Sequence, residues 1–416
     1  MPKIKATVDM NLGMILNAPY PPDMRVKKET DALIKAGFTI HLLCLRKKNE
    51  ATTEIVNGVH VTRIDAGKNN VQLAFWDMVI AFTFQHPVFK KKMQKWIRAN
   101  NLSVIHVHDL PLVGTALALR KKFNLTVIAD FHENYPEGLR TWFAWKKGLA
   151  VKLKNRIFMN PDRWENHERT AVLKSDRVIA VVEEMKKRLL QKYQPAVDTI
   201  HVISNTEEKA FINQEIDPAV YSGFANKFKI LYSGSIGPHR GVDTAVEAMQ
   251  YLKGYHDIEF IIVGSGSKDV MNHLKTLAGR LSVTDHVHFL GYQSFKKFFS
   301  YMHFADVNII PHKSNLHTDN TIPHKLFQAM MAARPVLVSS SDPLKRIIST
   351  HHAGLVFEAG NAKDFADKIL ELYNDRARAA ALGENGKNIT LHGDLNWDTE
   401  QKNLVTFYKD VFNQLT

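Results

Sequence analysis

Four side chains that can exchange protons stand at the ends of two apolar runs in the first half of the chain. His108 and Asp109 close the run VIHVHD, and His132 and Glu133 follow TVIADF. Since parallel strands end along one edge of a sheet, these groups should face a common rim. Imidazole beside carboxylate suits acid–base chemistry or the orientation of a hydroxyl-bearing substrate. The intervals match no standard metal-ligand spacing, so we predict no metal site.

The second half carries a glycine-rich stretch, GSIGPHRG, that leads from an apolar run into a helix. Glycines let backbone amides approach a phosphate, and Arg240 can add a charge-assisted contact. A plain turn with a solvated arginine is the alternative. The stretch VGSGSKD holds Gly264 in a Gly-x-Gly without the third glycine of a dinucleotide fingerprint. We therefore expect a phosphate-bearing ligand here, and neither NAD nor FAD.

A third polar loop, NTIPHKLFQ, runs from Asn320 to Gln328 and enters a helix ahead of an apolar strand. Loops that lead into a helix N-terminus at the edge of a parallel sheet commonly bind anions. Asn320 and Gln328 are the polar positions that should face such a ligand, and both are uncharged amides.

Apolar strands that alternate with amphipathic helices must position these groups, which predicts an α/β fold with doubly wound parallel sheets. Helices are expected at 26–36, 183–191, 242–252 and 270–281. Strands are expected at 14–18, 39–45, 104–109, 126–131, 177–182, 200–203, 229–234, 259–264, 287–291, 306–311, 335–339 and 354–357.

The pattern divides the chain into two Rossmann-like domains. The stretch 206–225 lacks clean periodicity and is expected to link a first domain, 1–205, to a second, 226–396. The last segment, 397–416, reads as one amphipathic helix.

Composition narrows the class of protein and its partners. The chain of 416 residues has a single cysteine, Cys44, which excludes a disulfide framework and favours a cytoplasmic protein. No run approaches the roughly 18 to 20 apolar residues that span a bilayer, and the first residues do not resemble a signal peptide. A net charge of +13 favours an anionic partner. Nucleic acid is not expected, because its usual motifs are absent.

Aromatic and basic residues cluster in the first domain. Trp142 and Trp145 precede five lysines or arginines between 146 and 156, and the stretch 89–98 reads FKKKMQKWIR. Such a surface favours peripheral docking on the anionic inner face of the cell membrane. The alternative is an ordinary helix with a buried aromatic face and solvated lysines.

Taken together, the chain resembles the GT-B glycosyltransferases of the large retaining family GT4. In the first half the resemblance rests on APYPPDMRVKKETDALIKAGFTIHLLCL, VIHVHDLPLVGTALAL, VIADFHENYP and SDRVIAVVEEMKKRL. In the second half it rests on ILYSGSIGPHRGVDTAVEAM, FIIVGSGS, VHFLGYQSFKKFFSYMHFADVNIIP, IPHKLFQAMMAARPVLVSS and AGLVF. The resemblance implies two Rossmann-like domains with a cleft between them. It also implies that helix 397–416 returns to the first domain.

The resemblance further implies a reaction. The second domain would bind a UDP- or GDP-linked sugar, and the first would hold a glycan or lipid-linked acceptor. The product would belong to cell-surface polysaccharide or glycolipid synthesis. The enzyme would be a retaining hexosyl- or N-acetylhexosaminyltransferase that needs neither metal nor cofactor.

Residue by residue, Arg240 matches the basic residue on the donor diphosphate, and His132 matches a histidine beside the donor sugar. Ser235 stands where many members have a second arginine, and Gly291 matches the turn that receives the base. The catalytic candidates are His132, Arg240, Asn320 and Asp109. The donor-binding candidates are Gly234, Ser235, Arg240, Gly264, Gly291, Ile322, Pro323, Lys325 and Gln328. The acceptor-binding candidates are Asp23, Arg25, Glu133, Tyr135, Trp142 and Trp145.

The chain departs from the family at one motif. Many members carry Glu-x7-Glu where this sequence has Asn320 and Gln328. An amide can still bond a hydroxyl, and it removes negative charge near a diphosphate. This departure leaves open a non-catalytic sugar-nucleotide-binding protein. The GT-B architecture, which also hosts such enzymes, leaves open a sugar-nucleotide epimerase or hydrolase.

Overall fold

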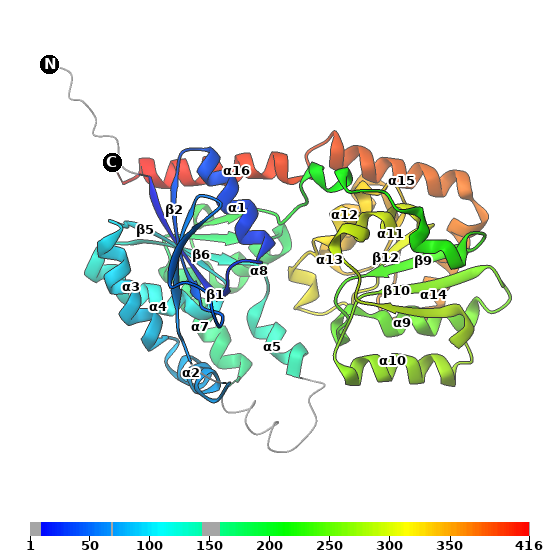
Figure 1. Cartoon of the computed structure of the whole chain (residues 1–416), viewed down its shortest axis with the longest axis horizontal. Coiled ribbons are helices and arrows are strands. Elements are labelled where there is room, and N and C mark those ends of the chain that lie inside the picture. The colour runs from blue at the N-terminus through cyan, green and yellow to red at the C-terminus, as the bar shows by residue number, and fades with distance from the viewer. Residues whose placement is uncertain (1–9, 68–69, 144–158, 416) are drawn as a thin grey trace. The chain divides into compact units, whose positions relative to one another are not determined.

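A computed structural model describes residues 10–67, 70–143 and 159–415. The chain forms two compact units (Figure 1). Unit 1 comprises the residues up to Ser204 together with those from Gln401 onward, and unit 2 comprises Asn205–Glu400. Each unit is a parallel-sheet α/β domain, which confirms the predicted fold class.

Unit 1 contains an eight-stranded sheet in the order β3-β4-β2-β1-β5-β6-β7-β8. All neighbours run parallel except β3 and β4. The central strands are buried on both faces, which is why they read as continuous apolar runs. The strands are β1 (Asn11–Pro19), β2 (Thr39–Leu45), β3 (Thr53–Val56), β4 (Val59–Ile64), β5 (Val104–His108), β6 (Thr126–Phe131), β7 (Arg177–Ala180) and β8 (Ile200–Val202).

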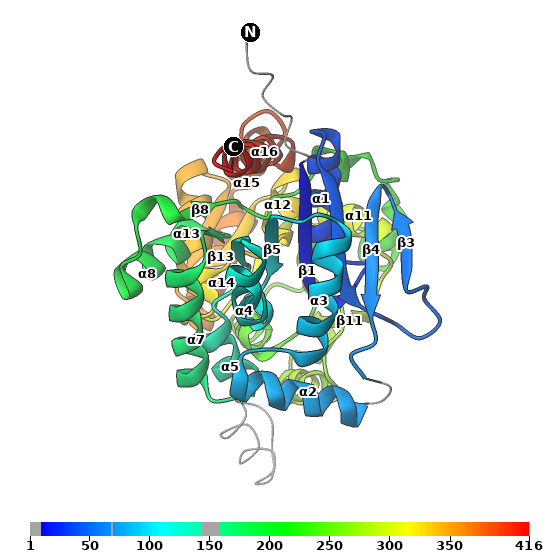
Figure 2. The same ribbon diagram turned by 90° about the vertical axis from the view of Figure 1, so that its left-hand side faces the viewer.

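Helices cover both faces of this sheet. The crossover from β1 to β2 runs one way along the sheet and those from β5 to β8 run the other way, so right-handed crossovers place α1 opposite α4 and α7. Helices α3, α4 and α7 form one layer (Figure 2). The helices are α1 (Met24–Lys35), α2 (Asn70–Thr83), α3 (Pro87–Ala99), α4 (Val113–Phe123), α5 (Tyr135–Phe143), α7 (Pro161–Lys174) and α8 (Glu183–Tyr193).

The hairpin of β3 and β4 was not among the predicted strands. Residues of β3 are largely exposed, so no apolar run marks it. A different signal was present, because Asn57 and Gly58 form the connection with φ of 50° and 83°. An Asn-Gly pair with left-handed dihedrals at both residues is typical of a two-residue hairpin turn.

Unit 2 contains a six-stranded parallel sheet in the order β11-β10-β9-β12-β13-β14. Its strands are β9 (Phe228–Ser233), β10 (Ile258–Val263), β11 (Val287–Gly291), β12 (Val307–Ile310), β13 (Val336–Ser339) and β14 (Gly354–Phe357). Its helices are α9 (Val242–Ala248), α10 (Lys268–Arg280), α11 (Phe298–Phe304), α12 (Lys325–Met331), α13 (Asp342–His351), α14 (Ala362–Asn374) and α15 (Arg376–Leu391).

The stretch 206–225, predicted as a linker, belongs to unit 2. It forms the 3₁₀ turns η3 (Lys209–Asn213) and η4 (Pro218–Phe224). Phe211 and Tyr221 are buried in the core cluster with α11, and the Tyr221 hydroxyl donates to the Tyr301 carbonyl oxygen at 2.9 Å. Two buried aromatic rings therefore anchor a segment whose sequence lacks periodicity.

The last helix, α16 (Trp397–Asn413), is continuous across the boundary between the units. From Gln401 onward it belongs to unit 1, where Phe38 makes ring contacts with Tyr408 and Phe412. Among the residues described, no helix has the length and apolar character required to cross a membrane.

Candidate functional site

The candidate site residues of unit 1 lie at the point of the sheet where the direction of the crossovers reverses. After β1 the chain turns toward β2, and after the neighbouring β5 it turns toward β6. The loops at such a point separate and leave a crevice beyond the carboxyl ends of the strands, the usual ligand site of open α/β sheets. Asp23 follows β1, Asp109 follows β5 and His132 follows β6.

A buried carboxylate, Asp130, stands at the centre of three imidazoles. Its Oδ2 lies 2.7 Å from His132 Nε2, 3.2 Å from His106 Nε2 and 3.4 Å from His108 Nδ1. The Tyr408 hydroxyl of α16 contacts His106 Nδ1 from the other side. The structure thus brings together the predicted His108 and His132, and adds Asp130 and His106, which the sequence analysis did not single out.

The pKa values of the residues in this cluster are shifted in opposite directions. Burial alone would lower the pKa of His132, but the adjacent Asp130 carboxylate outweighs it and raises that pKa to about 9. Burial and the neighbouring His106 lower the pKa of His108 to about 3. Burial opposes ionisation of Asp130, yet His132 and the other imidazoles hold its pKa well below the usual range. Near neutral pH the cluster is therefore an imidazolium–carboxylate pair beside a neutral His108.

Glu29 of α1 completes a set of possible metal ligands. One atom each of Glu29, His108, Asp130 and His132 lies within 4.8 Å of the others. Burial, followed by the charge of Asp130, raises the pKa of Glu29 to about 7. Sequence intervals did not predict this grouping, because Glu29 comes from a helix distant in sequence. As it stands, the set is a hydrogen-bonded cluster in which Asp130 already contacts two of the other members.

Asp23, Arg25 and Asp109 form a charged row at the same edge. Asp23 caps α1 by accepting from the Arg25 and Val26 amides, and its carboxylate pairs with the Arg25 guanidinium at 2.9 Å. Arg25 Nη1 lies 3.9 Å from Asp109 Oδ2. Asp109 adopts φ 62° and ψ 159°, a region that costs a residue other than glycine about 1–3 kcal/mol. Strained backbone of this kind clusters at ligand sites.

The remaining acceptor candidates lie at the start of α5. Glu133 precedes the helix, Tyr135 begins it, and the Tyr135 ring meets the Trp142 ring edge-on at 5.8 Å. Trp142 also covers Gly138, where a Cβ would lie 2.8 Å from the indole. Trp142 therefore packs on its own helix. Trp145 and the basic residues between 146 and 156 lie outside the described residues.

Lys325 is the central basic residue of the candidate site in unit 2. Its Nζ donates to the Ser233 carbonyl oxygen at 3.1 Å and lies 3.7 Å from the centre of the Tyr232 ring. Burial, and then the charge of Arg240, holds the pKa of Lys325 well below its usual value. A nearby anion would favour the charged ammonium, so this position gains from binding a phosphate.

Arg240 is held by histidines that the sequence analysis did not weigh. Its Nη1 donates to His312 Nε2 at 3.1 Å, so the proton of that neutral imidazole lies on Nδ1. Burial, then Arg240, keeps the pKa of His312 well below its usual value. The rings of His239 and His317 meet nearby at 5.5 Å. The signal was available, because His312 follows β12 at the same strand edge.

The turns that contain Gly234, Gly264 and Gly291 contact one another at the carboxyl edge of the unit 2 sheet. The Gly264 amide donates to the Gly291 carbonyl oxygen at 2.8 Å, and a Cβ on Gly264 would collide with the Gly234 carbonyl oxygen. Gly264 has φ 146°, which favours glycine. Nearby, Ser235 is exposed, whereas Ile322 is buried and Pro323 half-buried.

The two amides of the polar loop 320–328 have different partners. Gln328 Nε2 donates to the Glu207 carboxylate at 2.6 Å, and both side chains are 5% exposed. Asn320 Nδ2 donates to the Leu316 carbonyl oxygen at 2.8 Å. The structure thus places a buried carboxylate, Glu207, directly against the position where the family motif carries glutamate.

Two family descriptions match this chain. Glycosyltransferase Family 4 matches residues 25–206, and Glycosyl transferases group 1 matches residues 213–389. The two matches divide the chain nearly where the two units do.

Individual proteins are similar over most of the chain. An uncharacterized glycosyltransferase of Methanocaldococcus jannaschii is 27% identical over 299 residues, covering 71% of this chain and 72% of its own. A phosphatidyl-myo-inositol mannosyltransferase of Mycolicibacterium smegmatis is 22% identical over 329 residues, covering 78% of this chain and 75% of its own.

Solved structures share the fold at low identity. Sucrose-phosphate synthase from Thermosynechococcus elongatus superposes with a TM-score of 0.76 at 16% identity, over 97% of this chain and 100% of its own. Anabaena HepE in complex with UDP superposes with a TM-score of 0.68 at 13% identity, over 96% and 99%. Both likenesses concern the arrangement of the sheets and helices.

Proposed function

This chain belongs to the GT4-like glycosyltransferases of the GT-B fold, and we propose that it transfers a sugar, with retention and without a metal, from a nucleotide-diphosphate sugar to a lipid-linked or glycan acceptor. The observation that carries the donor half of the proposal is the pair of basic side chains, Arg240 and Lys325, beside glycine turns at the carboxyl edge of the sheet. Relatives with mannosyltransferase names support a hexose donor.

The donor would lie along the carboxyl edge of the unit 2 sheet. Backbone amides of the glycine turns and the Arg240 guanidinium would receive the diphosphate, and Lys325 would regain its charge on binding. Tyr292, which directly follows Gly291 and is 78% exposed, offers an aromatic ring for the base. The thermal-shift screen below distinguishes uracil from guanine as the base.

In a retaining transfer, the bond from the anomeric carbon to the diphosphate loosens while the acceptor hydroxyl approaches the same face. Negative charge grows on the leaving diphosphate, and Arg240 and Lys325 would stabilise it. The His132 imidazolium would donate a hydrogen bond to a donor hydroxyl, with Asp130 keeping it charged. The leaving phosphate would accept the proton of the acceptor hydroxyl.

A thermal-shift screen against UDP-, GDP- and ADP-sugars and the free nucleotides tests the donor site. One nucleotide class should raise the melting temperature, because a ligand that binds only the native state stabilises it. EDTA should leave the shift unchanged. The Arg240→Ala variant should lose most of it, whereas Arg280→Ala, at the end of α10, should keep it.

The outcomes of the screen distinguish sugar transfer, hydrolysis and non-catalytic binding. A shift followed by hydrolysis that needs no acceptor would favour the hydrolase reading over transfer. Tight binding with no turnover on any acceptor would favour a non-catalytic binding protein. No shift with any nucleotide would overturn the proposed donor site.

For the acceptor, we infer a lipid carried in a membrane surface that unit 1 contacts through α2. Val71, Phe75 and Phe82 share one face of this helix and are 77%, 49% and 49% exposed. Helices α2 and α5 follow the carboxyl ends of β4 and β6, and so begin at the sheet edge where His132 lies. Exposed lysines of α3, Lys91 and Lys92 among them, add positive charge for anionic headgroups.

Sedimentation with vesicles of mixed neutral and anionic lipid tests this contact. We expect binding to phosphatidylglycerol-containing vesicles, and a loss of about tenfold in affinity for Phe75→Ser, because a buried aromatic side chain contributes roughly 1.5–3 kcal/mol. Ile55→Ser is the matched control, since Ile55 is 68% exposed on the β3 hairpin. Equal losses in both variants, or no binding by the unaltered protein, would contradict the proposed surface.

A further inference from the structure

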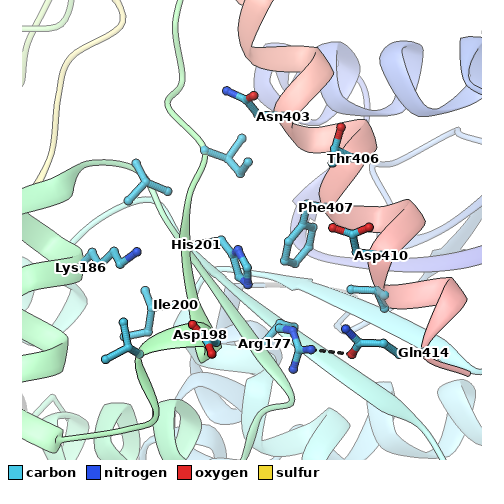
Figure 3. A pocket seen from close by; sticks show the side chains of 14 residues that line it. Arg177, Lys186, Asp198, Ile200, His201, Asn403, Thr406, Phe407, Asp410 and Gln414 are labelled. Atoms are coloured by element: carbon cyan, nitrogen blue, oxygen red, sulfur yellow. Dashed lines mark hydrogen bonds between the residues drawn. The ribbon is translucent and has the colours of Figure 1, made fainter.

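A pocket of about 580 Å³ lies in unit 1, and no member of the histidine cluster lines it (Figure 3). Its walls come from β7, β8, α8 and the unit 1 part of α16. The volume falls within the roughly 300–1,000 Å³ typical of small-molecule sites. Neither the proposed donor site nor the proposed acceptor site uses any residue of this pocket.

The inner part of the pocket is basic. Arg177, Lys186 and His201 are all half-buried there. Arg177 donates to the Gln414 side chain at 2.5 Å and to the Asp176 carbonyl oxygen at 2.8 Å, which leaves three of its five N–H groups available. Among the described residues, the Lys186 ammonium makes no ion pair. Two basic side chains, Arg177 and Lys186, around one space favour a phosphate group.

His201 supplies a buried polar atom with no partner of its own. Its Nε2 is shielded from solvent, and no hydrogen bond reaches it within the described part of the chain. Burial, followed by Arg177 and Lys186, lowers the pKa of His201. A buried, unsatisfied ring nitrogen costs stability, and a ligand group that reaches it would recover that cost.

The outer part of the pocket is acidic, and one aromatic ring lines the inner part. Asp198 and Asp410 are exposed at the rim, and neither pairs with a cation in the regions the structure describes. Carboxylates accept hydrogen bonds from hydroxyl groups. Phe407 forms the inner wall with its ring 4.8 Å from that of His201 (Figure 3). A ligand with hydroxyls near the rim and an anion inside would satisfy both parts.

We propose that this pocket binds a small phosphorylated sugar, with its phosphate on Arg177 and Lys186 and its hydroxyls on His201, Asp198 and Asp410. The proposal does not depend on the proposed donor or acceptor, because it rests on a different set of residues. The pocket also borders both chain crossings between the units. Val202 and Ile203 precede the crossing after Ser204, and Asn403 follows the one before Gln401.

Isothermal titration of the full chain with glucose 6-phosphate tests the proposal, with glucose and inorganic phosphate as partial ligands. We expect saturable binding of the sugar phosphate that is at least about tenfold tighter than binding of either partial ligand. Lys186→Ala should weaken it by about tenfold, and Asp410→Asn should weaken it without changing the affinity for inorganic phosphate. Lys187→Ala is the matched control, because Lys187 is the exposed next residue of α8 and does not line the pocket.

The outcomes are distinguishable from failure of the catalytic site. Equal affinity for inorganic phosphate and the sugar phosphate would overturn the sugar part, and equal affinity for glucose would overturn the phosphate part. An equal loss in Lys187→Ala, or no saturable binding at millimolar concentration, would overturn the site. Unchanged melting temperatures of the ligand-free variants exclude misfolding, and the Arg240→Ala variant should bind the sugar phosphate normally.

Discussion

Replacing Asp130 with asparagine is expected to reduce sugar transfer by on the order of 100- to 1,000-fold near pH 7. The carboxylate keeps His132 protonated in a buried place, where the pKa of the imidazole is about 9. Without that charge, burial lowers the pKa of His132 below its ordinary value of 6.5, and the ring becomes neutral at pH 7. A neutral ring can no longer give a charge-assisted hydrogen bond to the donor sugar.

The pH dependence separates this explanation from simple damage. The activity of the unaltered enzyme should fall only as the pH approaches 9, whereas that of the variant should fall from well below 7. Since the folded pKa of His132 exceeds the unfolded value of 6.5, its contribution to stability is complete below pH 6.5 and is lost as the pH rises through about 9. Urea titrations below pH 6.5 and above about pH 9 measure the free energy of unfolding at each end of this range. It should fall by on the order of 3 kcal/mol in the unaltered protein and not in the variant.

Asp176→Asn is the control for this experiment. Asp176 lies at the opposite end of the same sheet, where it contacts Arg120 and accepts from the Val127 amide at 2.8 Å. Its replacement should lower stability while leaving the shape of the pH profile unchanged. If it moves the profile as Asp130→Asn does, the role assigned to the Asp130 charge is wrong.

Glu207→Gln is expected to weaken donor binding by about 10- to 100-fold. We infer that this carboxylate takes the place of the acid that the family motif carries at position 328. It already accepts from the Gln328 amide at 2.6 Å, and ionised acceptors bond hydroxyls roughly twice as strongly as neutral ones. A donor titration of each variant followed by fluorescence or calorimetry measures the loss.

Exchanging the carboxylate of Glu207 and the amide of Gln328 tests whether the carboxylate is what donor binding requires. The double variant Glu207→Gln with Gln328→Glu moves the carboxylate across the same hydrogen bond and should recover at least about tenfold of the loss. Gln328→Glu alone places two carboxylates against each other and should bind donor poorly at neutral pH. A double variant no better than Glu207→Gln would show that the position of the acid, or its other contacts, decides binding.

The strands were predictable because most are buried on both faces. The runs 39–45 and 126–131, for example, coincide with β2 and β6, whose residues are nearly all buried. The exposed strand β3 has no such run, and only its turn residues carry a signal. The stretch 206–225 belongs to unit 2 although its sequence lacks periodicity, because its burial depends on two aromatic residues.

The sequence predicted which strand ends carry the candidate residues, but not which of these residues contact one another. The rule that ligands gather at the carboxyl edge led to His108, His132, Arg240 and Lys325. Which groups touch depends on register and distant packing, because β5 pairs with β6 so that His108 stands opposite Asp130. Glu207 lies 121 residues from Gln328 in the chain, and no local pattern connects them.

Helix α16 has a consequence for how the protein is made. Unit 1 depends on Leu404, Tyr408 and Phe412, which are synthesised after all of unit 2. During translation, the first 204 residues therefore emerge with an apolar face around Phe38 that nothing yet covers, and they wait in that state while unit 2 appears. Unit 1 is therefore the later of the two units to complete its core.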